Sequence, residues 1–328
     1  MELSCFEREL VAALQRAPRA PYATLAGRLG VAERSVRRAM RRLRDDGVLT
    51  YSATIAREDT HGWLAAQLEI GCRAGMSDAV AHALAARPDT RYVAVATGDA
   101  DLVVELVAPD PGALHTLVVH ELPALDGVRS VRSEVAVRLL LSAADWSPDG
   151  WRSPRRERVV QGKREAVGIQ LDDSDLAIVR ALDQDVRTPA ARIAQQVGLH
   201  ETTVQRRLHR LTESGALYMR ADVPPALLGF PLEARFTLQV RPDSLEAALR
   251  RLAREPTLRA LYIVTGTFNV LGYCVHGSTA ALEDFFAGPL AEVGGLLGCD
   301  IRVVLRAYKR NGVPVADERG NRHPTSTA

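Results

Sequence analysis

The feature that most constrains this chain of 328 residues is an internal duplication. Residues 22–49 and 190–217 align at a constant offset of about 168 positions. Identical positions include Ala26, Gly30, Glu33, Val36, Arg38, Arg42, Leu43, Gly47 and Leu49, which recur as Ala194, Gly198, Glu201, Val204, Arg206, Arg210, Leu211, Gly215 and Leu217. A repeat of this length predicts that one architectural unit is built twice in one polypeptide.

Each copy of the repeat reads as two short helices around a glycine turn. In the second helix of the first copy, Val36, Met40 and Leu43 follow at i, i+4 and i+7 and form one apolar stripe. The other faces carry six arginines and a single acid, Glu33. The second helix of a helix-turn-helix lies in the DNA major groove, and arginine suits contacts to guanine and to phosphate. An arginine face exposed only to solvent is the alternative, and the second copy argues against it.

A further helix precedes each pair and completes a three-helix head. Residues 3–16 carry capping-box spacing at Ser4 and Glu7, and Asp172 and Asp175 take these places in the second copy. Pro21 and Pro189 precede the next helix, where proline is tolerated because the first helical amides lack partners. Ala32 and His200 stand where the recognition helices need a cap, and neither is a good N-cap.

Behind each head, the pattern predicts a body domain. A short strand leaves the head and reaches Gly62 or Gly229. Strands are then expected at 64–70, 92–96, 102–107 and 131–141, and at 232–240, 261–264, 270–275 and 301–308, with helices at 77–87, 112–122, 244–255 and 279–290. The order β-α-β-β-α-β is that of a ferredoxin-like domain. One face of such a sheet stays free of helices, so we expect self-association through it.

The sequence therefore predicts an α+β fold in which a winged or three-helix helix-turn-helix domain and a ferredoxin-like domain each occur twice. The expected divisions are heads at 1–49 and 169–217, connecting strands at 50–61 and 218–229, bodies at 62–141 and 230–310, a linker at 142–168, and a disordered tail at 311–328. The linker is rich in Pro, Gly, Ser and charge, which favours a solvated tether. Trp146 and Trp151 are unusual in a tether and suggest docking on a domain.

Charge is distributed unevenly along the chain. Residues 1–49 carry ten arginines and six acids, whereas residues 62–141 carry six arginines and ten acids. A basic head on an acidic body suits a protein that contacts nucleic acid at one end. The four cysteines are scattered without zinc-binding spacing, so we expect free thiols, no metal and no cofactor. The absence of a signal-peptide pattern and of a long apolar run favours a cytoplasmic protein without membrane contact.

The combination of head, connecting strand and ferredoxin-like body resembles the Lrp/AsnC family of transcription regulators. The most specific marker is the loop ATGDADL at 96–102, which is similar to the TG-x-x-D turn of the family, and the second copy reads VTGTFNV at 264–270. Family members usually carry one copy per chain and dimerise, so this chain resembles a covalent pseudo-dimer.

The resemblance implies roles for the recognition-helix residues on double-stranded DNA. Those matching the exposed N-terminal part of the helix would contact bases: Arg34, Ser35 and Arg38, with Thr202, Thr203 and Arg206. Phosphate contacts are assigned to Arg37, Arg41, Arg42, Arg207 and Arg210.

The resemblance also implies a small effector, often an amino acid, near the turn. The matching positions are Thr97, Gly98, Asp99 and Asp101, and Thr265, Gly266, Thr267 and Asn269. Backbone amides could bind a carboxylate, and Asp101 could pair with an ammonium group. Alternatively, Thr-Gly only makes the hairpin turn. Because Asn269 replaces the acid in copy two, a structural role is favoured there.

Two alternatives to a sequence-specific regulator remain. Sirohaem decarboxylases resemble the same family and would need His and Arg side chains in a body pocket to handle tetrapyrrole carboxylates. The body histidines, His61, His82, His115, His120 and His276, do not fall at matching places in the two copies, so we expect no enzyme. An architectural DNA-binding protein with little sequence preference is the other alternative.

Overall fold

The computed structural model describes residues 3–55, 64–150, 152–162, 171–214 and 216–315. Gly62, Trp151 and Gly215, which the sequence analysis singled out, lie outside these ranges. The chain divides into two compact units. The head unit comprises residues 1–61, 147–151 and 165–228, and the body unit comprises residues 62–146, 152–164 and 229–328.

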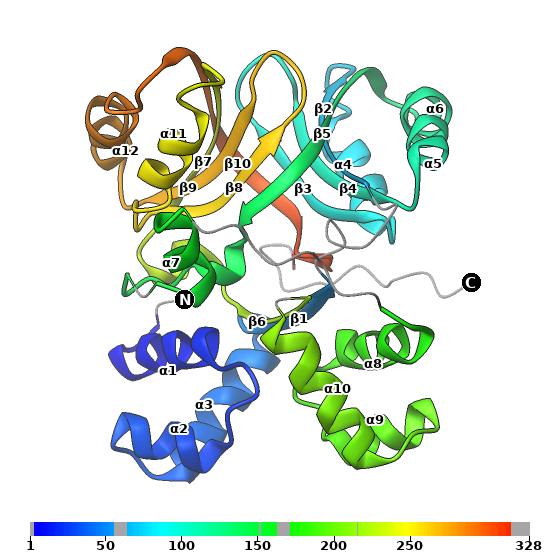
Figure 1. The fold of residues 1–328 in the computed structure, drawn as a ribbon, viewed down its shortest axis with the longest axis vertical. Helices are drawn as coiled ribbons and strands as arrows, with labels where there is room; N and C mark the ends of the chain where they lie inside the picture. Colours follow the sequence, from blue (N-terminus) through cyan, green and yellow to red (C-terminus); the bar gives the residue numbers. More distant parts are fainter. Residues whose placement is uncertain (1–2, 56–63, 151, 163–170, 215, 316–328) are drawn as a thin grey trace. The chain divides into compact units, whose positions relative to one another are not determined.

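Two three-helix heads make up most of the head unit (Figure 1). The first contains α1 (Cys5–Arg16), α2 (Tyr22–Leu29) and α3 (Glu33–Asp45), and the second α8 (Asp173–Gln184), α9 (Ala190–Val197) and α10 (Glu201–Glu213). Both predicted capping boxes are present, from Ser4 to Glu7 and from Asp172 to Asp175. These reciprocal bonds satisfy amides that the first turn of a helix cannot pair internally.

The predicted connecting strands join the two heads to each other. β1 (Thr50–Ile55) pairs antiparallel with β6 (Leu217–Asp222), with Thr50 opposite Asp222. Ala53 on β1 is buried in the core of the second head, beside Ile178 and Leu217. The sequence predicted strands here but gave no indication that they pair, because both are short and neither carries a pairing motif.

The body unit contains the β-α-β-β-α-β order twice, as predicted. The first body runs β2 (Leu64–Cys72), α4 (Ser77–Ala86), β3 (Thr90–Ala96), β4 (Leu102–Ala108), α5 (Pro111–Thr116), the π-helical η2 (Leu117–Glu121), α6 (Leu122–Ala124) and β5 (Val128–Leu141). The second runs β7 (Leu232–Val240), α11 (Leu245–Leu252), β8 (Leu258–Val264), β9 (Val270–His276), α12 (Thr279–Phe285), the π-helical η5 (Phe286–Leu290) and β10 (Leu296–Arg310).

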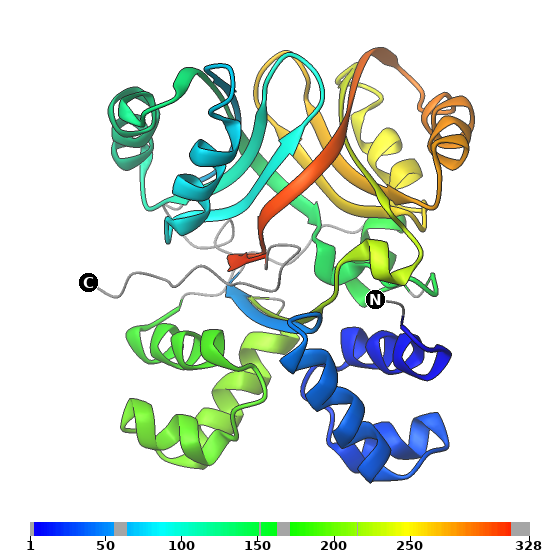
Figure 2. The same ribbon diagram turned by 180° about the vertical axis from the view of Figure 1, so that it is seen from behind.

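The strands of the two bodies form one closed ring. The order is β10-β3-β4-β2-β5-β8-β9-β7, and β7 pairs back to β10. β5 pairs with β2 as far as Ala136 and then with β8 of the other body, and β10 likewise passes from β7 to β3, with Val304 at the change of partner. Figures 1 and 2 show these two long strands crossing between the bodies.

The two faces of the sheet have different environments. One face packs against helices, for example Leu68 with Leu84 in the first body and Phe236 with Leu249 in the second. The other face forms a shared core that draws Ala65, Val107, Leu139, Tyr262 and Leu271, among others, from both bodies. The helix-free faces, which we expected to mediate self-association between chains, are thus covered within one chain, so this argument for oligomerisation fails.

The predicted linker is partly an ordered structural element, which corrects the expectation of a solvated tether. It contains η3 (Ala143–Asp145) and α7 (Pro154–Val160). Trp146 is buried and donates a hydrogen bond of 3.0 Å from Nε1 to the Pro256 carbonyl, so it docks as suggested. Arg156, also buried, donates to the carbonyls of Ala253, Glu255 and Leu258. Carbonyls that follow α11 and the first carbonyl of β8 thus explain why an arginine is buried here.

The first residues of the predicted disordered tail are also ordered. Asn311 and Gly312 both adopt positive φ and turn the chain, so that Val313–Pro314 (β11) pairs with the end of β10. The remainder of the predicted tail, 316–328, lies outside the described residues.

A short 3-10 helix, η4 (Pro225–Leu228), completes the described elements. Within the described ranges, the helices are all too short or too polar to cross a bilayer, and the four cysteines are unpaired.

Candidate DNA-binding surface and ligand site

Each recognition helix is fixed to its head by its apolar stripe. Val36, Met40 and Leu43 of α3 are at most 1% exposed, and Val204 and Leu211 of α10 are fully buried. The turn before each helix requires Gly30 and Gly198, which adopt left-handed φ values of 64° and 68°. As expected from Ala32 and His200, neither helix receives a side-chain cap. Uncapped amides at the start of a helix remain available to an anion such as phosphate.

The first recognition helix presents an exposed arginine surface. Arg34, Arg38 and Arg41 are exposed, and within the described residues no hydrogen bond or ion pair engages their guanidinium groups. Ser35 is half-buried beside them. These side chains can contact DNA without breaking an internal bond.

Other arginines of α3 are held by neighbouring groups. Arg37 hydrogen-bonds Glu33 one turn earlier, at 3.0 Å from Nε, and lies 4.6 Å above the Tyr22 ring. Arg42 forms an ion pair with Glu7 of the α1 capping box at 2.5 Å. A phosphate contact by Arg37 or Arg42 would therefore compete with an existing interaction.

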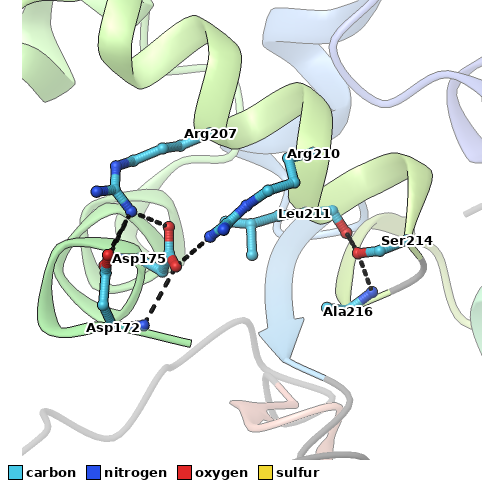
Figure 3. A network of polar contacts seen from close by, with 7 residues as sticks. All are labelled: Asp172, Asp175, Arg207, Arg210, Leu211, Ser214 and Ala216. Carbon is cyan, nitrogen blue, oxygen red and sulfur yellow. Dashed lines mark hydrogen bonds and ion pairs between the residues drawn. The ribbon is translucent and has the colours of Figure 1, made fainter. Parts of the chain in front are cut away.

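In the second head, the equivalent ion pair is more extensive (Figure 3). Asp175, whose side chain is fully buried, accepts from Arg207 at 2.8 Å and also from Arg210. Arg207 bonds Asp172 as well, at 2.7 Å. These two arginines, predicted to contact phosphates, instead join α10 to the start of α8. The acidic partners hold the pKa of Arg207 above its usual range, with the Asp175 bond the largest cause.

The remaining predicted residues of α10 face solvent. Thr202 and Arg206 are exposed, Thr203 is half-buried, and no described residue forms an ion pair with Arg206. The free basic surface of the second head is thus smaller than that of the first, because α10 carries three arginines where α3 carries six.

The two TG turns connect the bodies to each other. The Thr97 hydroxyl accepts a hydrogen bond of 2.9 Å from the Val303 amide in β10, and the Thr265 hydroxyl accepts an equivalent bond of 2.9 Å from Val135 in β5. Gly98 has a φ of 107°, and a Cβ there would lie 3.1 Å from Arg302.

Asp101, which was expected to pair with an ammonium group, and Asn269, which replaces it in copy two, both have backbone partners. Asp101 accepts from the Cys72 amide at 2.7 Å, and Asn269 makes the equivalent bond to the Val240 amide at 3.0 Å. Asp99, Gly266 and Thr267 are exposed. Each turn thus contacts the long strand that passes between the bodies, β10 for the first turn and β5 for the second. The structure does not bring the two turns together into one site.

A polar cavity of about 70 Å³ is lined by residues of both bodies. Its lining includes residues that the sequence analysis missed: Arg91, Tyr92, Glu105, Glu233, Arg259, Tyr262, Tyr273 and Arg310. Burial alone would raise the pKa of Glu233, but Arg310 and Arg259 outweigh it and hold the pKa below its usual range. These residues lie on strands far apart in sequence, so only the ring topology reveals them.

Comparison with known proteins agrees with this architecture. Residues 6–44 and 171–212 match the AsnC-type helix-turn-helix domain, and residues 65–143 match the Lrp/AsnC ligand binding domain. The HTH-type transcriptional regulator Ptr1 of Methanocaldococcus jannaschii is 31% identical over 140 residues, which are 42% of this chain and 95% of Ptr1. The regulator FL11 of Pyrococcus horikoshii is 25% identical over 43% of this chain and 93% of its own length.

One solved structure is similar over both copies. The siroheme decarboxylase NirDL superimposes with a TM-score of 0.58 over 95% of each chain, at 15% sequence identity. At that identity the likeness concerns the fold, and it shows that the complete two-copy arrangement occurs in another protein. With two AsnC-type heads and a ferredoxin-like body behind each, the chain belongs to the Lrp/AsnC family, as a tandem-duplicated member.

Proposed function

We propose that this protein is a transcriptional regulator that reads a two-part DNA site with two unequal heads. The observation that carries the proposal is the surface of α3, where Arg34, Arg38 and Arg41 are exposed and not engaged by other described residues. We assign base contacts to Arg34, Ser35 and Arg38, and a phosphate contact to Arg41. Thr202, Thr203 and Arg206 take the base-reading role in the second head.

The two heads should contribute differently to binding. Phosphate neutralisation supplies most of the sequence-independent affinity of a DNA-binding protein. α3 has more arginines than α10, and Arg207 and Arg210 of α10 are occupied by Asp175. We therefore expect a strong half-site for the first head and a weaker, different half-site for the second.

We further propose that the bodies bind a small zwitterion such as an amino acid. The cavity offers cationic side chains for a carboxylate and Glu105 and Glu233 for an ammonium group. Its volume of about 70 Å³ suits a ligand of only a few heavy atoms. The exposed TG turns, with Asp99 and Thr267, are the second candidate site.

The tetrapyrrole-enzyme alternative receives support from the fold of NirDL only. The cavity of about 70 Å³ is far below the roughly 300–1,000 Å³ typical of sites for drug-sized ligands. A larger pocket of about 500 Å³ on the second body has a lining without His or Arg: Phe286, Leu290, Ala291, Leu296, Cys299 and Ile301. The described body histidines also lie apart from the smaller cavity: His82 meets Tyr308 edge to face, His115 meets His120 edge to face, and His276 is buried against Phe285. His61 lies outside the described residues.

The test of DNA reading is selection from sheared genomic DNA of the source organism. We expect enrichment of a few promoters that share an asymmetric two-part motif, and loss of enrichment in Arg34→Ala/Arg38→Ala. The matched control, Arg129→Ala/Arg254→Ala, removes two exposed body arginines and should bind like the parent protein. Retention of DNA without enrichment would favour an architectural role instead.

The effector test is a thermal-shift screen of the amino acids, repeated on two variants. Arg259→Gln alters the cavity, and Asp99→Ala/Thr267→Ala alters one turn in each body. Loss of the shift in the first variant alone would place the ligand in the cavity, and loss in the second alone would place it at a turn. No shift with any amino acid would contradict the effector proposal.

A further inference from the structure

A cluster of charged side chains lies where the two bodies meet, and its acids and its cations come from different bodies. Arg235 on β7 places Nη1 3.0 Å from Oε1 of Glu69 on β2, and Arg302 on β10 places Nη1 3.2 Å from Oε2 of the same carboxylate. Glu134 on β5 lies opposite Gln67 in the pairing of β5 with β2, two residues from Glu69, and both arginines oppose the rise that burial imposes on its pKa. The first body thus supplies two acids, and the second body supplies two cations.

The duplication reveals what each body would meet if it paired with a copy of itself. At the offset of 168, Gln67 corresponds to Arg235, Glu69 to Thr237, and Glu134 to Arg302. Two first bodies would therefore place Glu69 against Gln67 and Glu134, without an inner cation. Two second bodies would place Thr237 against Arg235 and Arg302, without an inner acid. Buried charges of one sign without a partner strongly disfavour association.

Two further charges stand at the rim of this cluster. Arg132 lies 3.6 Å from Glu69 with its side chain 73% exposed, and Asp300 pairs with Arg302 at 2.7 Å with its side chain 38% exposed. These residues also occupy equivalent positions and carry opposite signs. Their exposure lets water and salt screen them, so they compensate little for the buried charges.

Two tyrosine contacts between the bodies would also be lost if a body paired with a copy of itself. The Tyr262 hydroxyl donates to Glu105 at 2.9 Å, and the Tyr92 hydroxyl lies 3.4 Å from Glu233. The equivalents of these four residues are Ala94, Tyr273, Ala260 and Ala65, respectively. In a self-pair, Glu105 would face Ala94 and Glu233 would face Ala260, so each buried carboxylate would lose its hydroxyl donor.

We infer that each body is the exclusive partner of the other, and that the interface rejects self-pairing. Every pair of bodies therefore combines one first body with one second body, so the two different recognition helices occur in a one-to-one ratio. Specificity of this kind arises from mismatches in the wrong pair as much as from contacts in the right one. It does not depend on DNA binding and is measured without DNA.

The test uses the complete protein with a protease site in place of residues 164–169. The folded chain is cleaved, dissociated in urea, refolded, and examined by native mass spectrometry, in which the two fragments differ in mass. We expect mixed pairs only, with each self-pair at least tenfold below the proportion that random association gives. Self-pairs in random proportions would overturn the inference.

Two variants separate the charge rule from general stability. Glu69→Gln/Glu134→Gln removes the like-charge repulsion between first bodies, and first-body pairs should then appear. If that variant fails to refold, Thr237→Glu supplies an acid to the second body, and second-body pairs should appear instead. The control Glu121→Gln/Asp126→Asn changes two exposed acids of the first body and should give mixed pairs only. Unchanged pairing in both test variants would refute the charge mechanism.

Discussion

Arg19 and Arg187 occupy equivalent positions in the two heads, and each donates hydrogen bonds to the loop of the other. Arg19 Nη2 donates to the Thr188 carbonyl at 2.9 Å, and Arg187 donates to the Pro18 and Ala20 carbonyls at 2.6 and 2.7 Å. Burial, with the nearby charge of Arg187, lowers the pKa of Arg19. This reciprocal exchange adds to the β1–β6 ribbon and fixes one head against the other.

Replacing Arg187 by alanine should therefore loosen the spacing of the two heads. We expect affinity for a complete two-part site to fall about 10-fold, while affinity for an isolated half-site stays the same, because only simultaneous engagement depends on spacing. Fluorescence anisotropy on both DNAs measures this difference. Arg180→Ala, an exposed change on α8, is the control. An equal loss on both DNAs would mean that Arg187 supports the fold of a head or contacts DNA itself.

Asp175→Asn should destabilise the second head. The carboxylate is fully buried and bonded to Arg207 and Arg210, and hydrogen bonds to charged groups contribute about 1.5–3 kcal/mol. Because both arginines reach solvent, we expect a loss near the lower end of that range. Urea unfolding monitored by circular dichroism provides the measurement. Asp173→Asn, on the exposed side of the same helix turn, should change stability by less than about 0.5 kcal/mol.

Substitutions of Arg41 and Arg38 should affect DNA binding differently. The first should change how affinity depends on salt, and the second should change how it depends on sequence. Arg41→Ala should weaken binding to all sequences and reduce the slope of log K against log salt by about 1. Arg38→Ala should cost about 1–3 kcal/mol on the specific site and relax selection at one base pair. Titrations at several salt concentrations, on the specific site and on single-base variants, distinguish the two. Arg254→Ala should leave both quantities unchanged.

Lys309 should make stability depend on alkaline pH. Its ammonium group is buried against the Arg87 carbonyl and the Thr90 hydroxyl, and burial lowers its pKa to about 8. Between that value and the usual value of about 10.4, the unfolded chain holds a proton that the folded chain has released. The free energy of unfolding should thus rise with pH in this window, by up to about 1.4 kcal/mol per pH unit.

Lys309→Met should remove this rise, and urea unfolding between pH 7.5 and pH 10 measures it. If the stability of the variant still rises with pH as that of the parent protein does, another titrating group causes the effect.

The sequence predicted the elements of the fold well because they depend on local patterns. The stripe of Val36, Met40 and Leu43 and the capping pair Ser4 and Glu7 lie within one helix turn or two, where spacing decides structure. The β-α-β-β-α-β order was confirmed for the same reason.

The sequence did not predict the contacts that close the ring. Val137 and Leu305 lie at the register shifts where β5 and β10 leave one body and enter the other, and no local pattern marks such a change of partner. Arg156 was expected in a solvated linker because its neighbours are charged, yet distant carbonyls bury it. The cavity residues were missed because Arg91 and Arg259 lie just before the predicted strands 92–96 and 261–264, whereas the structure places both on strands, β3 and β8.

A ring of strands that runs through both bodies also changes how occupancy depends on protein concentration. A regulator that must dimerise dissociates as it is diluted, so occupancy of its two-part site falls with the square of concentration. Here the second head is always present at the effective concentration set by the ring and by the β1–β6 ribbon. Occupancy should therefore follow the first power of chain concentration, and a few molecules per cell could hold a promoter without an assembly threshold.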